Sequence, residues 1–380
     1  MSKALRVVHV VIDDHGGSIE YARRLCVASA SMNVSSLATV LPLQPVPSTG
    51  PRSAAAWATA QVPIVTLPAA RNLFGLARAI CALRPIIRRA DVVVTHTGAA
   101  GLVGRIAGLL AGRPVVHVAH NWPGASPGGG LRARILGSLD LLLAPLTAAV
   151  IAPSHAMRRV GLANGWARSG RCGVIRYALD RARLATQCDA DRAAARATLG
   201  LPAHAPVIAF CGRFDPVKGA LVFVAAAQAL AAQHPDLIAV MAGDGPDAVA
   251  VTEAAHAAGC VRLLGWRNDV PRIYQAADIA CVPSTSEALG IVVLEALAVG
   301  TPVVATSVGG LPEAVGPGGV LAPSGDLAAL VAAIDGLLRD QPRRERLAKR
   351  GRRWVERVYG GNAWAEDHRD LWQRLMRRVR

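Results

Sequence analysis

Short runs rich in Val and Ile alternate with Ala-, Leu- and Arg-rich segments along the whole chain, and this alternation limits the fold more than any other feature. Most of these runs are apolar throughout rather than alternately apolar and polar, which is typical of strands covered on both faces. With helical crossovers between them, they predict parallel sheets of the α/β class. The candidate strands are residues 6–12, 35–41, 90–96, 114–120, 148–154, 172–177, 206–212, 236–243, 261–265, 279–284 and 301–306.

The chain has 380 residues, which is too long for one ordinary core, so we expect two domains of roughly 150 to 200 residues. The strand pattern restarts near residue 206, after the Ala- and Arg-rich segment 180–205. We therefore expect two doubly wound, Rossmann-like domains that face each other across a cleft. The first is residues 1–178, joined by a C-terminal helix at 360–380, and the second is residues 179–359. Ligands of such sheets bind beyond the carboxyl ends of the strands, so the cleft is the expected active site.

The formal net charge of +16 is concentrated in the first half of the chain. Residues 1–180 hold 19 Lys and Arg against 6 Asp and Glu, whereas residues 181–380 hold 23 against 20. This excess indicates an anionic partner such as acidic lipid headgroups or a polyanionic acceptor, although an Arg-rich genome would also produce it. Nucleic acid is not expected, because aromatic residues make up only 4% and no nucleic-acid-binding motif is present.

Seven cysteines are scattered along the chain without any CxxC pair, which indicates reduced core thiols in a cytoplasmic protein. The first apolar run meets Asp13 and Asp14 too early for a signal sequence or a membrane span. The longest apolar stretch, 135–153, is interrupted by Asp140 and Pro145, so we expect a helix followed by a buried strand.

Two carboxylates, Glu287 and Glu295, bracket a run that is otherwise almost entirely apolar. A buried carboxylate is normally paired or bound to something. We expect Glu287 in the loop after strand 279–284 and Glu295 on the following helix, about one turn from its start. Between them, Gly290 and the first helical N–H groups predict an anion site. Such a layout could bind the hydroxyl groups and the phosphates of one nucleotide-sugar.

Arg213 and Lys218 leave the carboxyl end of strand 206–212 within the stretch GRFDPVKG, residues 212–219. Both could reach a diphosphate from that single loop. Either residue alone would most simply be a solvated loop charge. Their occurrence in one domain with Glu287 and Glu295 favours a binding site.

These motifs resemble those of the family 4 glycosyltransferases, which are retaining enzymes of the GT-B fold. The resemblance covers essentially all of residues 200–335 and is looser in the first half. It is carried by GRFDPVKG and by residues 242–247, 264–284, 287–295 and 300–315, and more weakly by 16–25, 115–124 and 151–159.

The resemblance implies a role for each matching residue. Arg213 and Lys218, in the loop that Gly212 begins, would hold the donor pyrophosphate, while Glu287 would contact sugar hydroxyls and Glu295 the ribose. His120 would lie near the sugar and the acceptor and polarise them. The remaining implied donor contacts are backbone amides and a base pocket: Gly16, Gly17, Gly290, Ile291, Trp266 and Arg267.

Fixed cations in a closed cleft could stabilise the departing diphosphate without a metal. The sequence has no Asp-x-Asp suited to a bridging divalent cation. We therefore expect no cofactor and no metal site. No carboxylate suited to a double displacement is identifiable, which favours front-face transfer. The segments 175–180 and 121–130 depart from the family pattern, so the acceptor is less defined than the donor.

We therefore expect a cytoplasmic retaining transferase that moves a hexose-type sugar from a nucleoside-diphosphate sugar to a glycan or lipid-linked acceptor. Cell-surface polysaccharide or lipopolysaccharide synthesis would be its pathway, with peripheral docking at the inner face of an anionic membrane. His96 could touch the acceptor or be structural, and His9 is expected in the core.

Three other functions fit parts of the sequence. A nucleotide-sugar epimerase would need more acidic residues before Asp180 than the chain has. An NAD-dependent Rossmann enzyme would use residues 243–248 as its glycine motif, but no acidic residue ends a following strand at the required distance. A non-catalytic glycan- or polyanion-binding protein would not need Arg213, Lys218 and both glutamates together.

Overall fold

A computed structural model describes residues 4–12, 17–42, 57–58, 60–70, 72–96, 98–125, 130–179, 184, 191–361 and 363–379. The chain divides into two compact units. Unit 1 is Met1–Tyr177 with Asn362–Arg380, and unit 2 is Ala178–Gly361. The sequence-based boundary was 178, with the C-terminal helix assigned to the first domain. The acceptor-binding and donor-binding roles of the two domains stay predictions.

Unit 1 contains a seven-stranded sheet with the order β3-β2-β1-β4-β5-β6-β7. Every neighbouring pair is parallel. Parallel pairing puts the carboxyl ends of all these strands at one edge. The strands are β1 (Leu5–Ile12), β2 (Val34–Leu41), β3 (Ile64–Thr66), β4 (Val92–His96), β5 (Val115–Val118), β6 (Ala149–Ala152) and β7 (Cys172–Val174).

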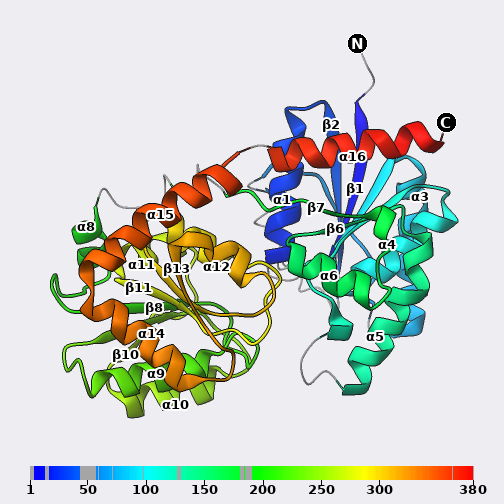
Figure 1. The fold of residues 1–380 in the computed structure, drawn as a ribbon. Helices are drawn as coiled ribbons and strands as arrows, with labels where there is room; N and C mark the ends of the chain where they lie inside the picture. Colours follow the sequence, from blue (N-terminus) through cyan, green and yellow to red (C-terminus); the bar gives the residue numbers. More distant parts are fainter. Residues whose placement is uncertain are drawn as a thin grey trace. The chain divides into compact units, whose positions relative to one another are not determined.

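Helices cover both faces of this sheet (Figure 1). Val8 and Val10 of β1 pack with α3 and α4 on one face, and Val11 packs with α1 on the other, because successive side chains of a strand alternate. The final helix α16 lies beside α1, where Tyr21 meets Trp364. The helices are α1 (Gly17–Ala30), α3 (Leu73–Arg88), α4 (Gly98–Leu110), α5 (Gly130–Leu143), α6 (His155–Ala163) and α16 (Ala363–Val379).

Unit 2 contains a six-stranded sheet with the order β10-β9-β8-β11-β12-β13, again parallel at every pair. The order reverses between β8 and β11, which is the switch point where doubly wound sheets bind ligands. The strands are β8 (Val207–Cys211), β9 (Ile238–Ala242), β10 (Val261–Leu263), β11 (Ile279–Val282), β12 (Val303–Thr306) and β13 (Gly319–Ala322).

A core cluster of unit 2 lies between its sheet and helices α9, α10 and α14. Phe210 of β8 and Phe223 of α9 are buried together there, with ring centroids 5.6 Å apart. The helices of this unit are α8 (Arg192–Thr198), α9 (Ala220–Ala231), α10 (Ala248–Ala258), α11 (Val270–Ala276), α12 (Ile291–Ala298), α13 (Leu311–Val315), α14 (Leu327–Arg339) and α15 (Gln341–Tyr359).

The prediction of parallel sheets is confirmed, and all eleven predicted strands overlap strands of the structure. Two strands were missed, β3 and β13. Both are short edge strands with incomplete burial, so neither has the long apolar run that signals a central strand.

The segment 135–153 forms the end of α5 and then β6, as predicted. None of the described helices is long and apolar enough to cross a membrane. The description of all cysteines as core thiols was wrong for Cys81, which is exposed on α3, while Cys188 lies outside the described residues.

Candidate active site

The loops that follow β8, β9 and β10 are joined by backbone hydrogen bonds at the carboxyl edge of the unit 2 sheet. Gly212 N–H donates to the Ala242 carbonyl at 3.0 Å, and Phe214 N–H donates to Asp244 at 2.9 Å. Gly243 N–H donates to the Gly265 carbonyl at 2.9 Å. The three loops therefore form one connected surface rather than three independent segments.

Asp215 organises the loop that carries the two predicted cations. One of its carboxylate oxygens accepts from the Arg213 Nε at 2.5 Å, and the other accepts from the backbone N–H of Lys218 at 2.8 Å. Asp215 is buried, whereas the Arg213 side chain is largely exposed. The guanidinium is thus held at the surface of the site by a fixed carboxylate.

Lys218 forms an ion pair with Glu287, with Nζ 2.5 Å from Oε2. This contact joins the loop after β8 to the loop after β11. The backbone of Glu287 is fixed as well, because its carbonyl accepts from Gly310 N–H at 2.9 Å. Gly309 has φ +51°, and an added Cβ there would overlap that carbonyl oxygen. Lys218 and Glu287, both predicted site residues, are therefore in contact. Glycine at position 309 permits the close approach of the next loop to the Glu287 backbone.

Helix α12 begins directly after this loop. Gly290 is its N-cap with φ 92°, a left-handed conformation that favours glycine, and it offers no side-chain cap. The first N–H groups of the helix, beginning at Ile291, are therefore available to an anion. These N–H groups carry a partial positive charge, and they closely follow Glu287, the ion-pair partner of Lys218, in the sequence.

Glu295 is buried on α12 and acts electrostatically on the end of β8. Burial raises the pKa of the Cys211 thiol, and the charges of Glu295 and Asp269 raise it further. Arg267 donates to both oxygens of Asp269, at 2.7 and 2.6 Å, and this bond lowers the pKa of Asp269. Trp266, beside Arg267, is 66% exposed. An indole face and a fixed guanidinium are thus available at the end of β10.

The other predicted site residues belong to unit 1. Gly17 begins α1, and Gly16 lies outside the described residues, as do Asp13 and Asp14. His120 follows β5 and is half-buried, and its Nε2 lies 2.9 Å from Nδ1 of His96. His96 is itself buried, so it supports His120 from below the surface, and His9 is in the core as expected.

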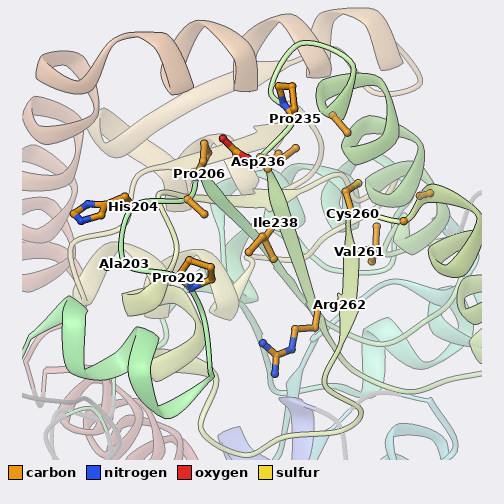
Figure 2. A pocket seen from close by; sticks show the side chains of 15 residues that line it. Pro202, Ala203, His204, Pro206, Pro235, Asp236, Ile238, Cys260, Val261 and Arg262 are labelled. Atoms are coloured by element: carbon orange, nitrogen blue, oxygen red, sulfur yellow. The ribbon is translucent and has the colours of Figure 1, made fainter.

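A separate hollow of about 840 Å³ lies at the opposite edge of the unit 2 sheet, near the starts of β8, β9 and β10 (Figure 2). Its labelled lining includes Pro206, Ile238 and Val261, with Arg262 at the rim. Arg262 Nη1 donates to the Gly200 carbonyl at 3.1 Å. Mostly apolar, Pro-rich walls lack the paired charges found at the carboxyl edge, so this hollow is not the candidate site.

Two family profiles match the chain. Glycosyltransferase Family 4 matches residues 16–183, and Glycosyl transferases group 1 matches residues 191–354. D-inositol 3-phosphate glycosyltransferase 2 of Catenulispora acidiphila is 33% identical over 317 residues, which are 76% of this chain and 72% of that protein.

The chain belongs to the family 4 glycosyltransferases.

A second relative of this family 4 glycosyltransferase is D-inositol 3-phosphate glycosyltransferase of Mycobacterium sp. (strain KMS). It is 35% identical over 278 residues, 66% of this chain, and the match spans only 60% of the relative's length. Among solved structures, sucrose-phosphate synthase of Thermosynechococcus elongatus has a TM-score of 0.83 at 24% identity, covering 98% of this chain and 99% of that one.

HepE of Anabaena, solved in complex with UDP, has a TM-score of 0.82 at 21% identity, with 97% of this chain and 100% of that chain covered. These likenesses establish the GT-B fold of the family 4 glycosyltransferase, as the sequence motifs predicted.

Sequence reasoning missed several residues of this family 4 glycosyltransferase that hold the site in place. Asp215 lies two residues after Arg213, and Asp269 lies two residues after Arg267. This Arg-x-Asp spacing could have identified both carboxylates as partners of the predicted cations. Tyr21 and His368, whose side chains lie 2.9 Å apart, come from α1 and α16. Nothing in the sequence links two residues so far apart.

Proposed function

We propose that the protein is a retaining glycosyltransferase that moves a hexose-type sugar from a nucleoside-diphosphate sugar to a glycan or lipid-linked acceptor. One observation carries this proposal. The Lys218–Glu287 ion pair joins the loop after β8 to the loop before α12, and the start of α12 has no side-chain cap. Membership of the glycosyltransferase family supports it.

In the proposed reaction, the bond between the anomeric carbon and the β-phosphate oxygen breaks, and its electron pair stays on that oxygen. Lys218, Arg213 and the first N–H groups of α12 stabilise the resulting charge. The acceptor hydroxyl oxygen bonds to the same face of the anomeric carbon, and its proton passes to the departing phosphate oxygen. Since the charge is balanced by side chains and amides, the reaction is proposed to need no metal and no cofactor.

The donor end of the site suggests which parts of the substrate each residue contacts. We assign Glu287, which is fixed by its backbone and by Lys218, to the sugar hydroxyls, and Glu295 to the ribose. The exposed indole of Trp266 offers a stacking surface for the base. HepE has been solved with UDP and with UDP-glucose, so uridine nucleotides are the first donors to test.

For the acceptor we propose a glycan or a lipid-linked sugar bound by unit 1, in cell-surface polysaccharide or lipopolysaccharide synthesis. One solved neighbour, WaaG, is described as a glycosyltransferase of lipopolysaccharide biosynthesis, with a TM-score of 0.75. The curated relatives act on D-inositol 3-phosphate according to their names, which makes that compound the alternative acceptor.

We further propose a cytoplasmic location with peripheral docking on an anionic membrane. Helix α5 exposes Leu131, Ile135 and Leu142, with exposed fractions of 73%, 53% and 70%. They lie on one side of the helix because they are four and seven residues apart. The exposed Arg134 adds positive charge beside them. Apolar contact with cationic flanks is what an amphipathic helix needs at an anionic interface.

The membrane proposal is tested by sedimentation with anionic liposomes at low and high salt. The triple variant Leu131→Gln, Ile135→Gln, Leu142→Gln should lose binding that the wild type shows. Val249→Gln, an equally exposed position on α10 of unit 2, is the matched control. Failure of the wild type to bind at low salt would refute the proposal.

The transferase proposal is tested by incubating the protein with UDP-, GDP-, ADP- and dTDP-hexoses and candidate acceptors, with and without EDTA. We expect one donor to yield a glycoside of unchanged anomeric configuration, seen by NMR, with EDTA lowering the rate by less than twofold. An epimerised free nucleotide-sugar would support the epimerase, and tight binding without turnover would support a binding protein. Inverted configuration would contradict the retaining reaction.

A further inference from the structure

A second cavity of unit 2, of about 430 Å³, adjoins the hollow shown in Figure 2 and shares residues 203–206 with it. Its wall includes Pro206 before β8, Asp278 before β11 and Gly300 before β12. In a parallel sheet, the starts of all strands lie at one edge. The cavity is therefore at the edge opposite the candidate active site and is separate from it.

Three arginine side chains line this cavity and gather around one carboxylate. Arg192 and Arg196 come from α8, and Arg344 comes from α15. Oδ1 of Asp278 lies 2.5 Å from Nη2 of Arg192 and 4.0 Å from Nη2 of Arg344. Oδ2 lies 2.9 Å from Nη2 of Arg196 and also accepts from the backbone N–H of Val207 at 2.8 Å. A single negative charge therefore faces three positive charges.

The wall has one further carboxylate, Glu345, which is exposed and accepts from Gln341 Nε2 at 3.0 Å. Three arginines against two carboxylates leave the wall with a net positive charge. Burial and the neighbouring charge of Arg192 lower the pKa of Arg196, as expected where guanidinium groups repel each other. Helix α15 adds to the positive potential, because it contains eight Lys and Arg residues but only two Glu. An anion in the cavity would relieve this repulsion.

Arg196 has a structural role in this group. It is buried, its Nε donates to the Ala276 carbonyl at 3.0 Å, and its Nη1 donates to the Ala203 carbonyl at 2.6 Å. These bonds hold α8 against α11 and against the segment before β8. The remaining nitrogen, Nη2, compensates the charge of Asp278. Arg192 and Arg344 are therefore the cations left for a ligand.

Both of these arginines have polar hydrogens that the protein does not use. Nη1 of Arg344 donates to the carbonyls of Leu337 and Leu338, both at 2.6 Å, which fixes the guanidinium. Its Nε and Nη2 have no hydrogen-bond partner among the described residues, since 4.0 Å to Asp278 is too long for such a bond. Nε and Nη1 of Arg192 are equally without a partner in the described part of the chain. The two side chains are 17% and 44% exposed, so an anion can reach them.

We propose that Arg192 and Arg344 form a second anion site, which binds one phosphate group of an inorganic phosphate ion or of a small phosphate monoester. Guanidinium groups bind phosphate oxygens in pairs. Both Nη2 atoms lie within 4.0 Å of the same Asp278 oxygen, so the two groups can share one tetrahedral anion. A volume of about 430 Å³ is in the range of small-molecule pockets, so the remainder of a small ester also fits. Binding here does not depend on the proposed transferase reaction, because the site lies at the other edge of the sheet.

Calorimetric titration of inorganic phosphate at constant ionic strength tests the site without any activity. All substitutions are made in Lys218→Ala protein, in EDTA, so that the proposed diphosphate site does not contribute. We expect one phosphate per chain, and a dissociation constant at least tenfold higher with Arg192→Gln or Arg344→Gln, since each removes hydrogen bonds from a charged donor. Arg343→Gln is the matched control and should leave the dissociation constant unchanged, because Arg343 is exposed on the same helix but does not line the cavity.

Two results would overturn the proposal. One is no phosphate binding to the Lys218→Ala protein, and the other is equal weakening by Arg343→Gln and Arg192→Gln, which would show a diffuse ion atmosphere around α15. Since the Arg192 side chain pairs only with Asp278 among the described residues, Arg192→Gln should fold even if Arg344→Gln does not.

Glycerol 3-phosphate, titrated in the same way, distinguishes the two sources of the phosphate group. Tighter binding than inorganic phosphate would assign the cavity to a phosphate monoester, and weaker binding would assign it to the free ion. Binding of either compound that Arg192→Gln does not weaken would contradict the assigned site. If no nucleoside diphosphate binds the wild type, the proposed function fails, while the phosphate titration still decides this site.

Discussion

The carboxyl edges of the two sheets carry different kinds of polar group. At the carboxyl edge of unit 2, fixed ion pairs dominate: Lys218 with Glu287, Arg213 with Asp215 and Arg267 with Asp269. Near the same edge of unit 1, His96 and His120 are imidazoles that burial keeps neutral. One fold class therefore carries paired charges at this edge in one unit and neutral imidazoles in the other.

This difference gives the two units different sensitivities to pH. Ion pairs between carboxylates and Arg or Lys keep their charges over the whole neutral range. The buried histidines of unit 1, including His368 with a pKa lowered to about 4, favour folding only while they are neutral.

The largest expected effect is therefore acid destabilisation of unit 1. Below the unfolded pKa of 6.5, the unfolded chain binds protons that the buried His9 and His368 do not bind until about pH 3 and pH 4, because burial lowers the pKa of each. Stability is full above pH 6.5 and falls on the way down to pH 3, by about 1.4 kcal/mol per histidine and pH unit. His9 and His368 together should remove about 4 kcal/mol by pH 5. Hydrogen exchange resolved by unit should show unit 1 losing protection first, and simultaneous loss in both units would contradict the comparison.

The next largest effect is expected from Lys218→Ala. Loss of one preorganised cation at the departing diphosphate should lower kcat/KM by about 10²- to 10³-fold. Lys349→Ala on the exposed face of α15 is the matched control and should match the wild type. Steady-state kinetics with the identified donor provide the measurement. Near-normal turnover in a folded Lys218→Ala protein would show that the diphosphate is held elsewhere.

Glu295→Gln should have a smaller effect, mainly on binding of the nucleoside. The substitution keeps the volume of this buried side chain but removes the charge that would accept from ribose hydroxyls. Hydrogen bonds to charged groups contribute about 1.5 to 3 kcal/mol, so nucleoside diphosphate affinity should fall by about 10- to 100-fold. Calorimetric titration measures it. An unchanged dissociation constant would remove Glu295 from the ribose site.

The smallest effect is expected from Asp215→Asn. An amide oxygen can still accept from Lys218 N–H, but the exposed Arg213 loses its anionic partner. Exposed ion pairs contribute little, roughly 0.2 to 1 kcal/mol, so diphosphate affinity should change by less than about fivefold. Asp236→Asn, at the opposite edge of the sheet, is the control. A loss as large as that of Lys218→Ala would mean that Arg213 is a primary anion ligand held in place by Asp215.

The same contrast explains what the sequence could predict. In unit 2, Arg213 with Lys218 and Glu287 with Glu295 lie within short motifs, so strand ends and helix starts can be placed from local pattern alone. In unit 1, His9, His96, His120 and Trp372 come together only because β1, β4, β5 and α16 are neighbours in the fold. Residues that far apart carry no mutual spacing signal. Edge strands β3 and β13 were missed for the related reason that short, partly exposed strands lack a long apolar run.

The central claim is that a nucleoside diphosphate binds at the carboxyl edge of the unit 2 sheet through Lys218. Calorimetric titration of UDP, GDP, ADP and dTDP into the wild type, Lys218→Ala and Lys349→Ala, all in EDTA, tests it most directly. The account predicts that one diphosphate binds the wild type and Lys349→Ala equally, and binds Lys218→Ala at least 100-fold more weakly. Equal binding by all three proteins, or no binding of any diphosphate, would contradict it.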